Sequence, residues 1–109
     1  MNIRLASSVL VTALIRKAEA EGGFGAVLAK GDASAGSVLV ILTERGGNAC
    51  LYERILQPDG NYGWLPATRE PEEVPAFVAR RRRFDPDSWV LELDIPARER
   101  FAAAMNAFD

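Results

Sequence analysis

The sequence predicts one α+β domain, in which helices cover one face of an antiparallel β-sheet. Three apolar runs in the first half of the chain are separated by short turns, which is typical of a β-meander. Helical periodicity precedes these runs and appears twice after them. The chain contains no internal repeat, low-complexity tract or linker, so its 109 residues are expected to form a single domain over 1–109.

The first expected element is an amphipathic helix near the N-terminus. Plotted at about 100° per residue, five apolar residues share one face: Leu10, Val11, Leu14, Ile15 and Ala18. Ser7 or Ser8 is the expected N-cap, and the pair Gly22–Gly23 should end the helix.

The same stretch allows a second interpretation, a secretory signal peptide. Arg4 precedes the apolar stretch, and the small residues Ala18 and Ala20 resemble a cleavage site. Against this interpretation, Arg16 and Lys17 lie between the apolar stretch and that site. The run is also much shorter than a bilayer span, which needs about 20 residues. We therefore favour the packed helix and expect no membrane contact.

Three strands are expected at residues 24–30, 37–44 and 49–56. The second run is apolar on both faces, which places it in the middle of a sheet. Residues 31–36 form the first connecting turn, and Arg45–Asn48 carries a hairpin signal. These three strands are predicted to pair in sequence order.

The second half of the chain continues with a loop whose turn is Asp59-Gly60. A short strand at 62–67 should lie at a sheet edge, because Pro66 cannot donate a ladder hydrogen bond. A helix at 71–83 and an alternating strand at 88–94 follow. Three large apolar side chains predict a final helix after residue 96: Phe101, Met105 and Phe108.

Composition excludes several chemistries. Histidine is absent, Cys50 is the only cysteine, and the formal net charge is −2. The usual proton shuttle, the Ser–His and Cys–His nucleophile pairs and histidine metal ligands are therefore ruled out. We expect no metal, no cofactor and no catalytic residue, a buried Cys50 and a cytoplasmic protein. A slightly acidic chain has no general attraction for nucleic acid, which we do not expect as a partner.

The most motif-like stretch is "KGDASAG", where Gly31 and Gly36 have the GxxxxG spacing of a phosphate-binding loop. Ser37 and Val38 stand where such a loop carries its lysine and its hydroxyl, and a strand follows in place of a helix. We interpret the stretch as a hairpin turn in which both glycines adopt positive φ and Asp32 bonds local backbone.

Four consecutive arginines, Arg80–Arg83, form the main cationic feature. They suit phosphate or an acidic partner, but successive helical residues point about 100° apart, so they cannot all face one ligand. The alternative is that they pair with the helix dipole and with Glu92 and Asp94, which share one face of the last strand. Asp85 is expected to cap the turn after the helix.

The aromatic residues Tyr62 and Trp64 flank a glycine-rich loop. They form either the lip of a binding site or a cover over the core, and the residues themselves favour neither interpretation. Both are kept as candidate site residues.

Two stretches together resemble the bacterial family called domain of unknown function 1491. They are "LIRKAEAEGGFGAVLAKGDASAGSVLVIL" and "RRRRFDPDSWVLELD", and the resemblance spans roughly residues 3 to 94. The tail from Ile95 to Asp109 is expected to be a helical extension beyond it. The resemblance implies a compact stand-alone bacterial domain and carries over no activity and no site residue.

The leading functional hypothesis is a non-enzymatic module that binds a protein partner or a small anionic ligand. Its candidate surface combines the arginine run, the first turn and the aromatic loop: Asp32, Tyr62, Trp64, Arg80, Arg82, Arg83 and Asp85. The alternative is a small metal-dependent hydrolase or nucleotide-handling enzyme that uses Asp32, Asp85, Glu92 or Asp94 with an arginine. A homodimer through the sheet edge opposite the Pro66 strand is a further expectation.

Overall fold

The computed structural model describes residues 5–106, which form one α+β domain. The helices in that range are α1 (Ser7–Ala20), the short 3-10 helix η1 (Pro71–Glu73), α2 (Val74–Phe84) and α3 (Arg98–Met105). The strands are β1 (Phe24–Ala29), β2 (Val38–Glu44), β3 (Gly47–Leu56), β4 (Tyr62–Thr68) and β5 (Trp89–Asp94). The predicted helices and strands are therefore confirmed, apart from the position of Phe108, which lies outside the described residues.

The sheet is mixed, so the prediction of a purely antiparallel meander is wrong. Its strand order is β1-β5-β2-β3-β4, and β5 runs parallel to β2 and antiparallel to β1. Only β2, β3 and β4 form the predicted meander, with antiparallel pairing between neighbours. The last strand enters between the first two because its alternating apolar residues are buried best in the sheet interior.

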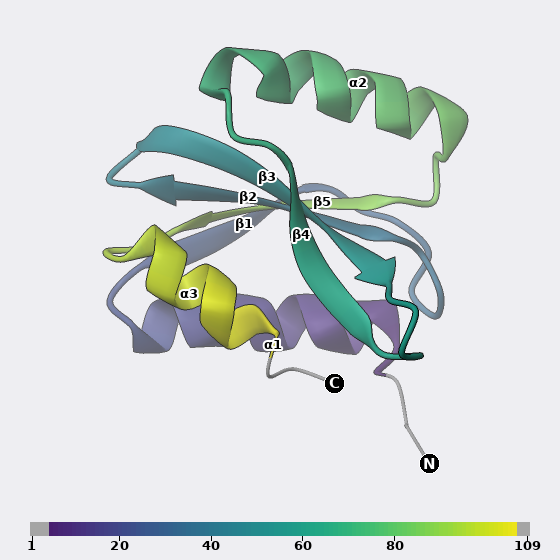
Figure 1. Cartoon of the computed structure of the whole chain (residues 1–109), viewed down its shortest axis with the longest axis horizontal. Coiled ribbons are helices and arrows are strands. Elements are labelled where there is room, and N and C mark those ends of the chain that lie inside the picture. The colour runs from purple at the N-terminus through teal and green to yellow at the C-terminus, as the bar shows by residue number, and fades with distance from the viewer. Residues whose placement is uncertain (1–4, 107–109) are drawn as a thin grey trace.

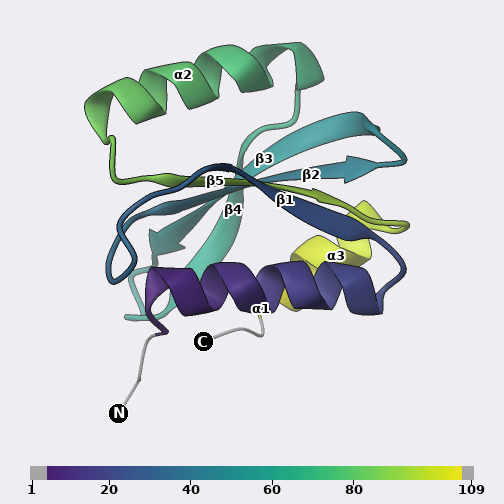
Figure 2. The same ribbon diagram turned by 180° about the vertical axis from the view of Figure 1, so that it is seen from behind.

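Helices cover both faces of the sheet, which corrects the expectation of one covered face. Figures 1 and 2 show α1 and α3 on one side and α2 on the other. The residues of β2 explain this arrangement, because both of its faces are apolar and buried. Val40 and Leu42 join the core beneath α1 and α3, whereas Leu39 and Ile41 pack in a second cluster with Val74 of α2.

The larger core lies between the sheet and α1, as the helical periodicity predicts. Four of the five predicted residues of α1 are buried, and the fifth packs half-buried against the cluster: Leu10, Val11, Leu14, Ala18 and Ile15. Cys50 is also fully buried in this core, as expected. No helix in the range 5–106 is long and apolar enough to cross a membrane.

The N-terminus of α1 is held by a loop and not by a serine cap. Ala6 occupies the N-cap position without a side-chain hydrogen bond, so the expected cap at Ser7 or Ser8 is wrong. The backbone N–H groups of Ser7 and Ser8 donate instead to the carbonyl oxygens of Ser34 and Ala33, at 3.2 and 2.9 Å. The first loop thereby satisfies donors that a helix start leaves open.

At three turns, the backbone has the conformation that the sequence indicates. Gly22 has φ of +88° and the N–H of Gly23 donates to the Ala18 carbonyl oxygen at 2.9 Å, which ends α1. The β2–β3 hairpin turns at Arg45 and Gly46, with φ of 51° and 80°. In the β3–β4 turn, Gly60 has φ of +88°.

Candidate functional site

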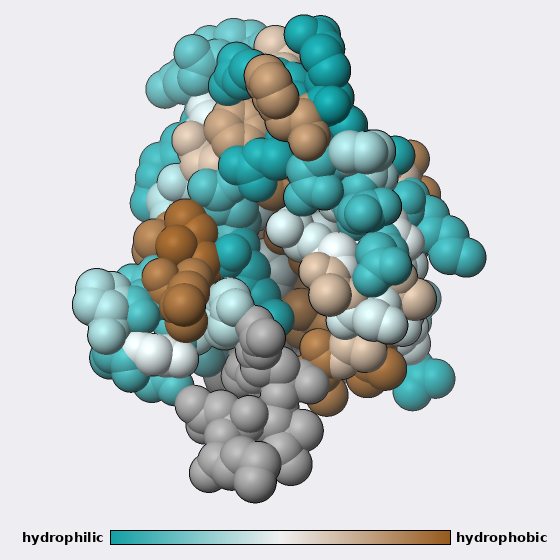
Figure 3. All heavy atoms as spheres, turned by 90° about the vertical axis from the view of Figure 1, so that its right-hand side faces the viewer, coloured by the Kyte–Doolittle hydropathy of each residue, from teal (hydrophilic) through white to brown (hydrophobic). Residues whose placement is uncertain are grey.

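Three loops and the start of α1 meet at the end of the sheet where β2, β4 and β5 begin. We call this region the loop end; it comprises residues 5–7, 30–37, 57–61 and 85–88. It lies on the right of Figure 1, and Figure 3 faces it and shows the molecule hollowed between its loops. Most of the predicted site residues come from or next to these segments.

The loop 30–37 is a turn, as predicted, and several of its backbone N–H groups already form hydrogen bonds within the protein. The Asp32 carboxylate accepts hydrogen bonds from the N–H groups of Ser34 and Ala35, at 3.2 and 2.9 Å. The N–H of Gly36 donates to the Asp32 carbonyl oxygen at 3.2 Å. Amides that a phosphate-binding loop would turn towards its ligand therefore bind the protein itself.

The glycines of this loop are explained by close packing and not by positive φ. Neither Gly31 nor Gly36 has positive φ, and the loop crosses the start of β5 to reach β2, so the hairpin expectation is wrong. A Cβ atom on either glycine would lie 2.1 or 2.2 Å from the carbonyl oxygen of Asp87. Only glycine allows the two backbones to approach this closely.

A small acidic cavity of about 180 Å³ lies where the loop 30–37 meets the turn after α2. Asp32, Asp85 and Asp87 line it together with Ala35–Ser37. Asp85 accepts from the N–H of Asp87 at 3.2 Å, which confirms its predicted role in the turn. Within residues 5–106, no group of three or more His, Cys, Asp or Glu residues could hold a metal ion.

Two residues of the arginine run are engaged within the fold. Arg81 forms an ion pair of 2.6 Å with Glu53 of β3, and Arg82 donates to the carbonyl oxygens of Pro86 and Ser88 at 2.6 and 2.5 Å. Arg80 and Arg83 are exposed. The predicted pairing of the run with a strand carboxylate is thus met by Glu53 in place of Glu92 or Asp94.

Asp94 lies at the opposite end of the sheet and has other partners. Its Oδ1 atom accepts hydrogen bonds from the Thr43 hydroxyl at 2.6 Å and from the Gly46 N–H at 2.8 Å. These bonds stabilise the charged carboxylate and hold the pKa of Asp94 below its usual value. The two acids of β5 share a face, as predicted, but Asp94 secures the β2–β3 turn.

The aromatic pair is divided between the core and a cavity. Trp64 is buried, and its backbone N–H donates to Oδ1 of Asn106 at 2.8 Å, so it does not form a lip. Tyr62 is half-buried, and the guanidinium of Arg54 lies 4.6 Å from the centroid of its ring. The binding-lip interpretation therefore remains for Tyr62 alone.

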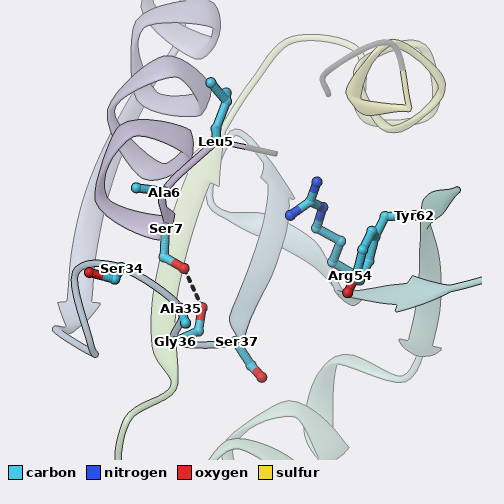
Figure 4. Close-up of a pocket in the computed structure, with 9 residues that line it drawn as sticks. All are labelled: Leu5, Ala6, Ser7, Ser34, Ala35, Gly36, Ser37, Arg54 and Tyr62. Atoms are coloured by element: carbon cyan, nitrogen blue, oxygen red, sulfur yellow. Dashed lines mark hydrogen bonds between the residues drawn. The ribbon is translucent and has the colours of Figure 1, made fainter. Parts of the chain in front are cut away.

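Arg54 and Tyr62 form one wall of the largest described cavity at the loop end, which we call the Arg54–Tyr62 cavity. Its volume is about 540 Å³. The start of α1 and the loop 30–37 form the facing wall, as Figure 4 shows, and a 2.6 Å hydrogen bond from the Ser7 hydroxyl to the Gly36 carbonyl oxygen joins these two segments. The described lining residues are Leu5, Ala6, Ser7, Ser34, Ala35, Gly36, Ser37, Arg54 and Tyr62.

Charge distinguishes this cavity from its acidic neighbour. Arg54 is the only charged residue among the described lining residues. The two cavities share the wall Ala35–Ser37, but Asp32 lines only the smaller one. The larger cavity is therefore suited to a negatively charged group.

Comparison with known proteins agrees with this architecture and identifies the family. The family model for the protein of unknown function DUF1491 matches residues 5–103. The chain belongs to this family. The match includes most of α3 and so extends beyond the two stretches that carry the resemblance in the sequence. No curated protein matches the chain.

Three solved structures, two of them of DUF1491 family proteins, have the same fold. An NMR structure of a family protein from Caulobacter crescentus is 36% identical, with a TM-score of 0.80, and the match covers 93% of this chain and 94% of that one. A crystal structure of a family protein from the same organism is 37% identical, with a TM-score of 0.80 and coverage of 89% and 94%. A solution structure of an A. tumefaciens protein is 34% identical, with a TM-score of 0.75 and coverage of 92% and 93%.

Sequence reasoning missed two residues of the cavity in this DUF1491 protein. Arg54 stands in a strand where polar and apolar residues alternate, but it follows Cys50 and Tyr52 on the face that is otherwise buried. A charged residue on an apolar face is the signal that could have found it. The sequence predicts Ser7 as a candidate helix cap, whereas its hydroxyl joins α1 to the loop 30–37.

Proposed function

We propose that this DUF1491 protein is a non-enzymatic module that binds a small organic anion in the Arg54–Tyr62 cavity. The observation that supports this proposal is the cationic Arg54, which lies in the described lining of the cavity beside the Tyr62 ring. A volume of about 540 Å³ lies within the usual range of small-molecule sites. The lone, buried Cys50 favours a reducing compartment, and we place the protein in the cytoplasm.

The geometry suits recognition of an oxyanion. A guanidinium presents paired N–H donors that match the two oxygens of a carboxylate or phosphate. Stacking on the Tyr62 ring restricts where the Arg54 guanidinium can point, so less side-chain freedom is lost when an anion binds. Arg54 is half-buried, which reduces screening of its charge by salt.

The rest of the ligand would meet a mixed surface. Among the other described lining residues, Leu5, Ala6 and Ala35 are apolar, and Ser34 and Ser37 are polar. A ligand with one anionic group on a compact apolar or aromatic body fits this lining better than a polyanion, because a polyanion needs several cations.

The arginine run supports the proposal less well than Arg54 does. Arg82 is bonded to two carbonyl oxygens of the 85–88 loop, and Arg81 is bonded to Glu53. The enzymatic alternative has less geometric support, because its carboxylates do not all converge on one site. Asp32 and Asp85 are at the loop end and bond backbone amides, whereas Asp94 is at the opposite end.

Isothermal titration calorimetry with phenyl phosphate and benzylamine tests the proposal. The two probes share a ring and differ in the sign of their charge, so we expect binding of the phosphate alone. Arg54→Gln removes the charge and keeps a polar side chain of similar length. Because a hydrogen bond to a charged group contributes about 1.5–3 kcal/mol, this change should weaken binding about ten- to hundredfold.

Arg83→Gln is the matched control, since it removes one exposed arginine of the run at the same end of the molecule. We expect it to leave the affinity unchanged. If phenyl phosphate does not bind, or if Arg83→Gln abolishes binding while Arg54→Gln does not, the proposed site is wrong.

A further inference from the structure

The two edges of the sheet differ in how well they are protected from pairing with another strand. At the β4 edge, Pro66 has no N–H to donate, and the outward N–H of Trp64 is taken by Asn106 at the end of α3. Proline and a covering helix are devices that prevent edge-to-edge association. The β4 edge is therefore closed.

The β1 edge carries no such device over most of its length. The strand Phe24–Ala29 contains neither a charged residue nor a proline. Three of its large apolar side chains are exposed: Phe24 by 61%, Val27 by 44% and Leu28 by 55%. On one side β1 pairs with β5, so its outer N–H and C=O groups have no neighbouring strand within residues 5–106.

A bulge interrupts the β1–β5 register between Val27 and Ala29. Bulges can protect an edge by twisting it. The residue skipped in the register is Leu28, near the end of the strand, so Phe24–Val27 remains regular and the pairs at the centre of a partner contact lie within it.

We propose that β1 pairs antiparallel with β1 of a second copy of this chain, which gives a twofold dimer with one continuous sheet. A register centred on Ala26 places that residue on the twofold axis. Phe24 then lies opposite Leu28 of the other copy, and Val27 lies opposite Gly25. Each exposed apolar side chain meets an apolar or small partner, and no charges are brought together.

A second copy fits better than an unrelated partner because the edge is complementary to itself. An uncharged strand has no electrostatic preference for a differently charged segment, whereas antiparallel self-pairing uses the same groups twice. The association also stops at two copies. Both β1 edges are consumed by the twofold contact, and each outer edge is then a closed β4 edge.

Sedimentation velocity of the full chain over a wide concentration range tests the dimer. We expect a monomer–dimer equilibrium in the wild-type protein and no larger species. Phe24→Lys places a charged side chain opposite the apolar Leu28 at both ends of the contact and should weaken dimerisation by about tenfold or more, equivalent to about 1.4 kcal/mol. Leu65→Lys is the matched control at the β4 edge, where Leu65 is 42% exposed, and it should leave the equilibrium unchanged.

A second variant keeps the test decisive if Phe24→Lys fails to fold. Ala26→Cys should form an intermolecular disulfide under mild oxidation, because the two cysteines would face each other across the axis. The wild-type protein should not form an intermolecular disulfide, because Cys50 is buried. A wild-type chain that stays monomeric at the highest concentration, or an Ala26→Cys variant that does not cross-link, would overturn the proposal.

Discussion

Replacing Gly31 with alanine should destabilise the protein strongly, because this glycine is where the loop 30–37 crosses the start of β5. The new Cβ atom would lie 2.1 Å from the carbonyl oxygen of Asp87, so the backbones would have to separate by about 1 Å. That shift would break two hydrogen bonds, from the Asp32 N–H to the Asp87 oxygen at 2.9 Å and from the Trp89 indole to the Asp32 oxygen at 2.7 Å.

The expected loss of unfolding free energy in Gly31→Ala follows from these contacts. Overpacking costs about 1–3 kcal/mol, and each lost hydrogen bond costs about 1 kcal/mol. The reduced entropy of the unfolded chain offsets about 0.4–1 kcal/mol. The net loss of unfolding free energy is therefore about 2–4 kcal/mol, which corresponds to a decrease in Tm of roughly 10–20 °C for a domain of this size.

Thermal and urea unfolding followed by circular dichroism would measure this change. Gly63→Ala is the control, because the nearest atom to its Cβ would be Gln57 Cγ at 3.5 Å, an ordinary contact. Its unfolding free energy should change by less than about 1 kcal/mol. If Gly31→Ala unfolds at the same temperature as this control, the backbones at the crossing are not closely packed and the explanation of the glycine is refuted.

Two further predictions concern charged groups. The Thr43 hydroxyl and the Gly46 N–H lower the pKa of Asp94, so its stabilising effect is complete above the ordinary carboxyl pKa and is lost as the pH falls through the lowered one. The wild-type unfolding free energy should therefore fall more steeply with acid than that of Asp94→Asn in urea titrations at several pH values, and parallel curves would contradict this. For the half-buried pair Arg81–Glu53, a double-mutant cycle with Arg81→Gln and Glu53→Gln should give a coupling of about 0.5–1 kcal/mol, and a coupling of zero would show that the pair contributes nothing.

The individual elements could be predicted from the sequence because their signals are local. Alternation in Trp89–Asp94, the apolar face of α1 and the positive-φ turn at Arg45-Gly46 each depend on a few neighbouring residues. The order of strands could not be predicted in this way. The runs that became β1 and β2 are close in sequence, yet β5 lies between them, because its position depends on burial against the whole sheet.

The candidate site was harder to predict for the same reason. The Arg54–Tyr62 cavity combines the start of α1, the loop 30–37 and the β3–β4 hairpin, which no sequence motif connects. Trp64 and Tyr62 are equivalent in sequence terms, and only the position of Asn106 at the end of α3 shows why Trp64 belongs to the core. The arginine run attracted attention because it is contiguous, whereas the single arginine in the cavity does not stand out.

Chemical-shift mapping tests the central proposal, the anion site, most directly. Phenyl phosphate would be titrated into the ¹⁵N-labelled protein, and amide shifts would be followed along the whole chain. The account predicts saturable shifts centred on residues 34–37, Arg54 and Tyr62, which line the cavity from opposite walls. Shifts centred on Arg80–Arg83, or none at all, would contradict it.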